Sequence, residues 1–183
     1  MGDFTRIYKT DLTDRQMMEF WRMVQLSDRD RDFAYCLPHM DGEGFVKWMR
    51  REDVHPWGLF YKGVPTGMSM ITDRRGKTAD IHFCTLPVGR RRAGRFSLVK
   101  AMGLFALANL LWEKNKSGRY VLDTLIGITP VSNRAACKYA LSLGGQPTAR
   151  IPNQCWYYDT NENVDGFVTV FTRDNVPSEY AAL

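Results

Sequence analysis

The chain has 183 residues, of which 44% are hydrophobic and 25% charged, and its formal net charge is +5. This is an ordinary globular balance, and the charge is too small to indicate a nucleic-acid-binding protein by itself. The length suits one domain with a sizeable core, so we expect residues 1–183 to form a single domain.

Hydrophobic periodicity and turn residues predict the elements in chain order. We expect strands at Phe4–Tyr8, Trp57–Lys62, Thr66–Thr72, Ala79–Leu86, Tyr120–Ile128, Thr148–Tyr158 and Gly166–Thr172, and helices at Thr13–Gln25, Glu43–Arg51, Arg95–Glu113 and Asn133–Leu143. The early and late strands suit antiparallel pairs, whereas the two strand–helix units in the middle suit parallel neighbours. The fold class is therefore α/β, a mixed sheet of about six or seven strands flanked by about four helices.

Three segments carry further local expectations. The helix at Arg95–Glu113 is apolar on nearly all sides, so we expect it to be buried against the sheet. The strand at Ala79–Leu86 alternates, which predicts one face made by Ala79, Ile81, Phe83 and Thr85 and an opposite face made by Asp80, His82, Cys84 and Leu86. We expect a solvated loop at Ser27–Asp32 and a frayed tail from Pro177 onward.

Cysteine spacing and hydropathy exclude two classes of protein. Cys36, Cys84, Cys137 and Cys155 form no CxxC pair, and no histidine lies at zinc-finger spacing, so we expect no metal site. The longest apolar stretch, Ala101–Trp112, is too short to span a bilayer. The N-terminus carries no secretory signal, and we therefore expect thiols in a reducing cytoplasm.

Two segments follow apolar strands and open helices. Leu86–Leu98 is rich in arginine and glycine, and Asn133–Gly145 begins with a helix-capping residue and ends with two glycines. A helix N-terminus presents unpaired N–H groups and a partial positive charge, which is a ready cradle for an anion. Two such units in this order indicate an enzyme that binds a nucleotide-bearing cofactor.

The order of elements and the first motif resemble the GNAT superfamily of N-acetyltransferases. The resemblance covers about residues 59–145. In that family the loop has the form Arg/Gln-x-x-Gly-x-Gly/Ala, and its amides hold the pyrophosphate of acetyl-CoA. Here Arg91 and Gly94 match this form, whereas Phe96 stands at the position of the last small residue.

The second motif in the family reads Asn-x-x-Ala-x-x-x-Tyr-x-x-x-Gly-Phe. Asn133, Ala136 and Gly144 match it. Ala140 stands at the tyrosine position, and Tyr139 comes one residue early. One residue on a helix is a turn of about 100°, so Tyr139 does not simply inherit the role of the family tyrosine, which often protonates the leaving thiolate.

The resemblance implies transfer of an acetyl or other acyl group from acyl-CoA to an acceptor amine, by direct attack in a ternary complex. The cofactor would lie between the strand ending at Leu86 and the strand beginning near Tyr120, with the thioester carbonyl polarised by backbone N–H groups near Cys84 to Leu86. The cofactor-binding residues that the resemblance implies are Cys84, Thr85, Leu86, Gly89, Arg90, Arg91, Arg92, Ala93, Gly94, Arg95, Phe96 and Asn133.

His82 is the first candidate for the general base, and Tyr139 is the second catalytic candidate, as an acid. An acceptor amine must lose a proton before it attacks, and histidine has a suitable pKa. The alternative for His82 is a ring packed and hydrogen bonded within the sheet. Cys84 is more often an inert thiol, and Asp123, inside an apolar run, is expected to be paired structurally rather than to act as a base.

Alternatives to the enzyme stay open at this point. The departures at Phe96 and Ala140, and the absence of a glutamate on the strand at Ala79–Leu86, also suit a non-catalytic binding or assembly module of the same fold. Short acetyltransferase-like proteins with degenerate motifs also occur in bacteriophages, so a phage or prophage origin stays open. The arginines at 90–92 and 95 also suit a solvated turn or a nucleic-acid patch, although no Lys-Ser/Thr follows to make a P-loop. The acceptor amine stays unidentified, and a homodimer stays open.

Overall fold

The computed structural model describes residues 3–26, 40–86, 92–93 and 96–182. Its helices are α1 (Asp14–Gln25), α3 (Gly42–Met49), α4 (Leu98–Leu111) and α5 (Arg134–Ser142), with a short 3-10 helix at Ser178–Ala182. Its strands are β1 (Phe4–Tyr8), β2 (His55–Tyr61), β3 (Val64–Arg75), β4 (Thr78–Thr85), β5 (Arg92–Ala93), β6 (Phe96–Ser97), β7 (Thr124–Pro130), β8 (Gln146–Tyr157) and β9 (Glu162–Thr172).

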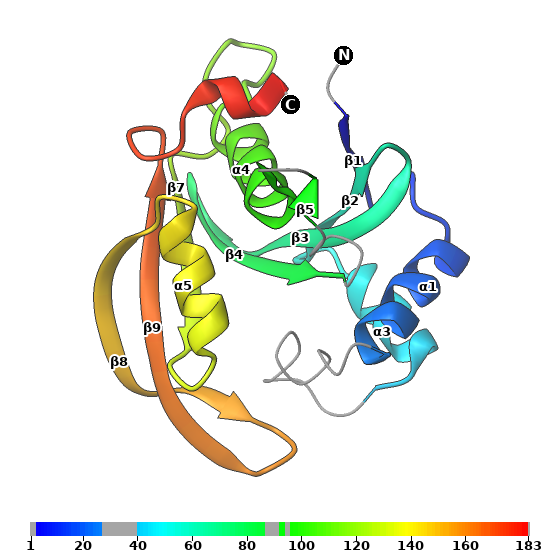
Figure 1. Cartoon of the computed structure of the whole chain (residues 1–183), viewed down its shortest axis with the longest axis vertical. Coiled ribbons are helices and arrows are strands. Elements are labelled where there is room, and N and C mark those ends of the chain that lie inside the picture. The colour runs from blue at the N-terminus through cyan, green and yellow to red at the C-terminus, as the bar shows by residue number, and fades with distance from the viewer. Residues whose placement is uncertain (1–2, 27–39, 87–91, 94–95, 183) are drawn as a thin grey trace.

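Seven strands form one sheet in the order β1-β2-β3-β4-β7-β9-β8, and the two-residue strands β5 and β6 form a separate ribbon (Figure 1). Within the large sheet β4 and β7 are parallel, whereas the other neighbours are antiparallel. The predicted mixed sheet, its early and late antiparallel pairs and its central parallel pair are confirmed.

Two hydrophobic clusters lie on opposite faces of β4, as the alternation predicts. Cys84 and Leu86 pack with Met68 and Met70 of β3 against α1 and α3. Ala79 and Ile81 pack with β7 and α4 on the other face. The helix α1 begins with a capping box between Thr13 and Gln16, and its apolar stripe supplies the buried residues Met17, Phe20, Trp21 and Val24.

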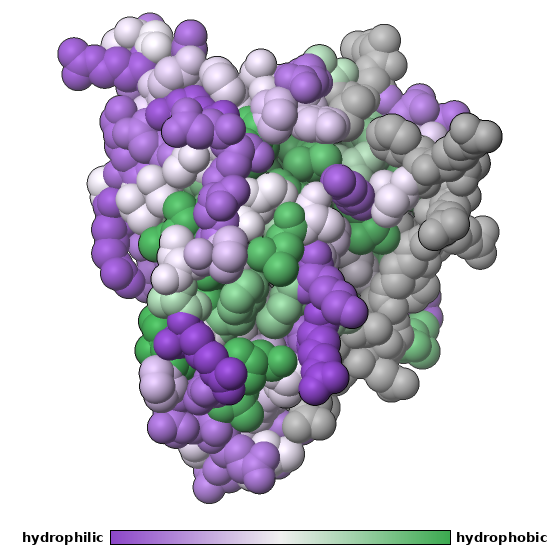
Figure 2. All heavy atoms as spheres, turned by 60° about the vertical axis from the view of Figure 1, so that its left-hand side comes forward, coloured by the Kyte–Doolittle hydropathy of each residue, from purple (hydrophilic) through white to green (hydrophobic). Residues whose placement is uncertain are grey.

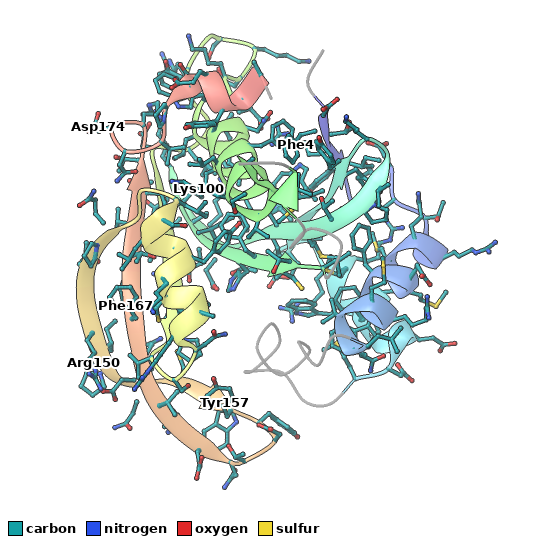
Figure 3. The ribbon with its side chains drawn as sticks, viewed as in Figure 1. Phe4, Lys100, Arg150, Tyr157, Phe167 and Asp174 are labelled. Carbon is teal, nitrogen blue, oxygen red and sulfur yellow. The ribbon has the colours of Figure 1, made fainter. Side chains whose placement is uncertain are left out.

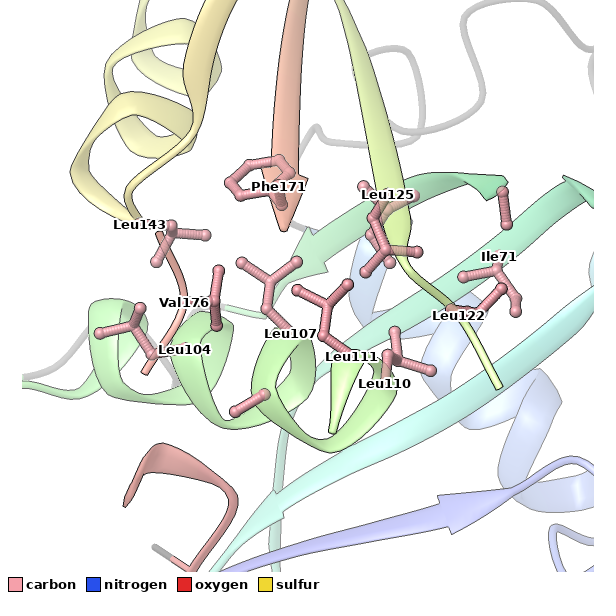
Figure 4. Packing of buried hydrophobic residues seen from close by; sticks show 13 residues of the cluster. Ile71, Leu104, Leu107, Leu110, Leu111, Leu122, Leu125, Leu143, Phe171 and Val176 are labelled. Carbon is pink, nitrogen blue, oxygen red and sulfur yellow. The ribbon is translucent and has the colours of Figure 1, made fainter. Parts of the chain in front are cut away.

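The helix α4 is buried along nearly its whole length, which confirms the prediction from its uniform hydrophobicity. Leu104, Leu107 and Leu111 pack against Phe171 of β9 and Val176 beyond it (Figure 4). Ser97 caps the helix, since its hydroxyl accepts a hydrogen bond from the Lys100 N–H at 3.4 Å. The helix therefore begins at Leu98, later than the expected Arg95, and Arg95 itself lies outside the described residues.

Several strand boundaries differ from the sequence prediction, and the largest differences are at the starts of β7 and β9. The strand expected at Tyr120–Ile128 begins only at Thr124, because Tyr120 forms an isolated bridge with Lys114 instead. The last strand begins at Glu162 rather than Gly166, since Glu162 pairs with Tyr157 across the β8–β9 hairpin. In both places a short-range pairing, Lys114 with Tyr120 and Tyr157 with Glu162, decided the boundary, and hydrophobic periodicity does not show it.

The expectation of a frayed tail is wrong. Trp112 donates its indole N–H to the Val176 carbonyl at 2.8 Å, and Asn109 donates to the Ala181 carbonyl at 3.3 Å. Tyr180 and Ala181 pack against the α4 cluster. The C-terminal 3-10 helix therefore docks on α4. The loop at Ser27–Asp32 lies outside the described residues. Among residues 3–26, 40–86, 92–93 and 96–182 no helix is long and apolar enough to cross a membrane.

Candidate active site

The two parallel strands at the centre of the sheet separate soon after they meet. β4 and β7 pair only at Thr78–Asp80 with Thr124–Ile126. Past this point the strands diverge, and α5 lies over the opened side (Figure 1). Beyond Asp80 and Ile126 the two strands no longer pair with each other, so the backbone N–H and C=O groups that face the gap are available to a ligand.

The register of the sheet shows which backbone groups face the gap. The Leu86 N–H donates to the Thr66 carbonyl at 2.9 Å, so the main-chain groups of His82, Cys84 and Leu86 point toward β3. The groups of Ile81 and Phe83 therefore point toward β7. The Val131 N–H donates to the Asp165 carbonyl at 2.9 Å, and by the same alternation Ile128 points its groups toward β4.

The gap contains a pocket of about 90 Å³ between the strands and α5. Its walls include Ile81, His82, Phe83, Ile128, Pro130, Asn133, Ala136, Tyr139, Ala140 and Phe171. The sequence predicts a cofactor cleft between these two strands, and the pocket lies at that place.

The helix α5 is a thin cover over this pocket. None of its residues is fully buried, and Leu141 on its outer side is 44% exposed. The molecular face that carries α5 and β8 shows apolar groups scattered among hydrophilic ones (Figure 2). Asn133 caps α5 by accepting the Ala136 N–H at 3.0 Å, and both residues line the pocket.

Tyr139 is bound to the neighbouring helix rather than presented to the pocket as a free hydroxyl. Its hydroxyl donates to the Val99 carbonyl in the first turn of α4 at 2.8 Å. Its ring meets Phe83 edge-on, with ring centroids 6.2 Å apart. Burial raises the pKa of Tyr139 well above its usual value. The hydroxyl proton is therefore engaged and hard to release, which argues against the expected acid role.

His82 lies at the gap on the β4 face opposite α4. Its Nε2 is 3.0 Å from the Thr72 hydroxyl of β3, and it lines the pocket. Burial lowers the pKa of His82, and the negative charge of Asp73 partly opposes that shift. The ring is therefore neutral at pH 7, which is the form a general base requires.

Asp80 shares the face of His82 and was not singled out from the sequence. It has no hydrogen bond or ion pair to any other residue in the described part of the chain. Burial raises the pKa of its carboxyl, with a further contribution from Asp73. The signal was present in the alternation of β4, which puts Asp80 two residues before His82.

Asp123, the acid that the sequence did single out, is paired as expected. Its carboxylate accepts from Arg173 at 2.5 Å and lies 3.3 Å from the Lys77 ammonium. These partners hold its pKa below the usual value, with Arg173 the larger cause. Asp123 thus ties the loop before β7 to the segment after β9 and takes no part in the gap.

Most of the arginine-glycine loop lies outside the residues that the structure describes. Gly89, Arg90, Arg91, Gly94 and Arg95 lie outside the described residues. Arg92–Ala93 pairs with Phe96–Ser97 as the ribbon β5–β6, which leads directly into α4. The expected order of strand, loop and helix N-terminus is therefore present.

Two of the expected cofactor contacts need correction. The Cys84 and Leu86 side chains are only 4% and 1% exposed, because they pack against α1 and α3. The Leu86 N–H is already bonded to Thr66, so it cannot polarise a carbonyl in the gap. By the same alternation the backbone groups of Phe83 and Thr85 point toward the gap, and the missed signal was the pairing of β4 with β3.

A second hollow, of about 450 Å³, adjoins the first at Asn133. It lies between the start of α5 and the β8–β9 hairpin and is lined by Ser132, Arg134, Tyr157 and Glu162 among others. Tyr157 lies low on the hairpin, near the start of α5 (Figure 3), and its hydroxyl is 3.0 Å from that of Ser132. Among the described residues no group of histidines, cysteines and acids could hold a metal ion.

No family model and no curated protein matches the chain. A probable GNAT-family acetyltransferase from Chromobacterium violaceum matches with a TM-score of 0.71 at 15% identity, covering 96% of this chain and 90% of the other. The chain has the GNAT fold.

Other GNAT structures match over a similar length. Spermidine N-acetyltransferase from Vibrio cholerae, solved with CoA and spermine, has a TM-score of 0.69 at 10% identity and covers 95% of this chain and 98% of its own. The N-acetyltransferase PseH from Campylobacter jejuni, solved with acetyl coenzyme A, has a TM-score of 0.58 at 13% identity, with coverages of 93% and 99%. The GNAT likeness is thus one of whole-chain architecture.

Proposed function

We propose that this protein transfers an acyl group from acyl-CoA to an acceptor amine. The observation that carries the proposal is the gap between β4 and β7, with backbone groups of Phe83 and Ile128 facing an opening under α5. The pantetheine arm of CoA carries two amides, which are suited to pair with such a strand edge. Structures of the same fold, solved with CoA or acetyl-CoA, support this choice of cofactor.

The phosphates of CoA would lie at the start of α4. Its N-terminus and the preceding arginine-glycine loop, residues 89–96, offer amides and positive charge for the pyrophosphate. Thr85 would contact the cofactor as it leaves the gap. Asn133 would do so from the opposite wall, where it already caps α5.

His82 would act as the general base on the acceptor amine. As the amine nitrogen attacks the thioester carbon, it gives an N–H proton to His82. The electron pair of that N–H bond stays on the nitrogen. The Phe83 N–H would stabilise the developing oxyanion. The carbon–sulfur bond then breaks, and the thiolate takes a proton from solvent. We assign Tyr139 to holding α4 and α5 together, because its proton is engaged with Val99.

The first test is calorimetric titration with acetyl-CoA, with desulfo-CoA and ATP as comparators. A micromolar Kd, about −8 kcal/mol, is expected. Ala136→Trp, which fills the pocket, should abolish binding. Leu141→Trp on the exposed side of α5 is the matched control and should bind as the parent does. Absence of binding at millimolar acetyl-CoA would refute the cofactor assignment.

The second test is release of CoA thiol in the presence of a panel of amines. The panel should include polyamines, because a neighbour in fold was solved with spermine, together with lysine peptides and aminoglycosides. His82→Ala should lower turnover by about a hundredfold or more and leave acetyl-CoA affinity intact. Tight binding without turnover for any amine would favour the non-catalytic binding module.

A further inference from the structure

We infer that Thr72 is a positioning residue, whose hydroxyl holds Nε2 of His82 and so leaves Nδ1 as the atom that receives the proton from the acceptor amine. The inference rests on the proposed function, in which His82 is the base. It adds a second residue from a different strand, which the sequence pattern of β4 alone does not indicate.

The geometry comes from the pairing of β3 with β4. Thr72 lies directly opposite Asp80, and Met70 lies directly opposite His82. The Thr72 and His82 side chains are therefore diagonal neighbours on one face, and the hydroxyl oxygen is 3.0 Å from Nε2. Nδ1 has no hydrogen-bond partner among residues 3–26, 40–86, 92–93 and 96–182.

The other described histidine shows the opposite arrangement. His55 lies on β2, and its Nδ1 is 2.8 Å from the Tyr8 hydroxyl. That ring is held through Nδ1, whereas His82 is held through Nε2. A sheet histidine in this protein thus takes its orientation from a hydroxyl on the neighbouring strand, and the position of that hydroxyl decides which nitrogen is engaged.

The proposed chemistry requires the Thr72 hydroxyl oxygen to accept a hydrogen bond from Nε2–H of His82. A neutral imidazole has one N–H and one lone pair, and only a lone pair can take the proton of the amine. With Nε2–H donating to Thr72 Oγ1, the lone pair is on Nδ1. After proton transfer both nitrogens carry hydrogen, and the Nε2–H bond to Thr72 persists. Thr72 therefore serves both the neutral ring before transfer and the imidazolium after it.

The charges around His82 favour the same sequence of events. Asp73 raises the tendency of the ring to take a proton, while burial opposes it. Asp80, opposite Thr72, is partly buried, and the charge of Asp73 raises its pKa whereas that of Arg75 lowers it. Burial favours the neutral resting ring, and the charge of Asp73 favours the imidazolium that forms on proton transfer.

Nitrogen-15 NMR of the imidazole rings tests the inference directly. The His82 signals, identified by their loss in His82→Gln, should show Nε2 protonated and Nδ1 unprotonated at pH 8. Thr72→Val, of similar shape but without the hydroxyl, should give a mixture of tautomers. Thr72→Ser should retain the parent spectrum. A parent ring with its hydrogen on Nδ1 would overturn the inference.

Kinetics provide the second readout. Thr72→Val should lower kcat about fivefold to tenfold, the effect of one hydrogen bond, with the KM for acetyl-CoA unchanged. The acid limb of the pH profile should move to lower pH, because the imidazolium loses an acceptor. Thr72→Ser should recover most of kcat. Thr148→Val on β8, whose hydroxyl bonds to the Val168 carbonyl at 3.4 Å, is the matched control and should behave as the parent.

The two assignments fail in different ways. If acetyl-CoA does not bind or no amine is acylated, the proposed function fails, and the NMR tautomer still decides whether Thr72 sets the ring. If the parent is active but Thr72→Val leaves both kcat and the tautomer unchanged, the positioning role is wrong while the function stands. Far-UV circular dichroism of each variant confirms that the sheet has formed.

Discussion

Gly103 is the residue of α4 on which the contact between the two helices depends. A Cβ built at Gly103 would overlap the Tyr139 hydroxyl oxygen and would lie 2.7 Å and 2.8 Å from the two terminal carbons of Leu143. Tyr139 also donates to the Val99 carbonyl, one helical turn before Gly103. We therefore expect Gly103→Ala to push α5 away from α4 and to break this hydrogen bond.

Opposing effects decide the size of the change. Alanine gains about 1 kcal/mol over glycine inside a helix. Overpacking a buried site costs about 1–3 kcal/mol, and a lost hydrogen bond costs about 0.5–1.5 kcal/mol. The costs exceed the gain, so Gly103→Ala should lower the free energy of unfolding by about 2 kcal/mol. For a chain of this length that corresponds to a fall in Tm of roughly 4–8 °C.

Urea unfolding of a double-mutant cycle measures the effect. Tyr139→Phe alone should cost about 1 kcal/mol, and Gly103→Ala should then cost about 1 kcal/mol less than in the parent, because the overlapping oxygen is gone. If Gly103→Ala is neutral or stabilising in the parent, the gain in helix propensity exceeds the cost of overpacking and of the lost hydrogen bond. Tyr139 would then not be packed against α4 as described.

The remaining predictions concern the catalytic assignment, the tail and pH. Tyr139→Phe should leave kcat within about threefold of the parent; a loss of more than a hundredfold at unchanged KM would restore its role as an acid. Removing residues 177–183 should lower the free energy of unfolding by about 2 kcal/mol in urea, because Tyr180 and Ala181 pack on α4, whereas Glu179→Ala should be neutral. Burial lowers the pKa of His82 in the folded protein. Below about pH 6.5 the unfolded chain therefore binds more protons than the folded chain, and stability decreases as the pH is lowered. His82→Gln should reduce that loss of stability between pH 6.5 and pH 5, and an unchanged slope would contradict the shift.

The alternation of side chains along β4 shows which features of the strand the sequence predicts and which it does not. It correctly divides the strand into a face toward α4 and a face toward α1 and α3, because side chains alternate along any strand. It does not show which backbone groups are used, since that depends on the register with β3. For that reason the backbone groups that face the gap are those of Phe83 and Thr85, and not those of Cys84 and Leu86.

The two acids in apolar strands make the same point. Asp80 and Asp123 both interrupt apolar runs, and the sequence gives no means of ranking them. Only folding brings Arg173 and Lys77 to Asp123, whereas Asp80 receives no such partner among the described residues. The acid without a partner in the described part of the chain is therefore Asp80, which the sequence did not single out and which lies on β4 two residues before His82.

The sequence by itself determined the order of elements, the mixed sheet, the buried α4, a cap for α5 at Ser132 or Asn133 and the resemblance to GNAT enzymes, because these follow from periodicity, turn chemistry and local motifs. The tertiary structure decided where β4 and β7 separate, which hydroxyl holds His82, where the Tyr139 proton goes and that the tail docks on α4. Each of these depends on groups far apart in the chain, whose meeting depends on register and packing across the sheet. Local sequence patterns do not encode such meetings.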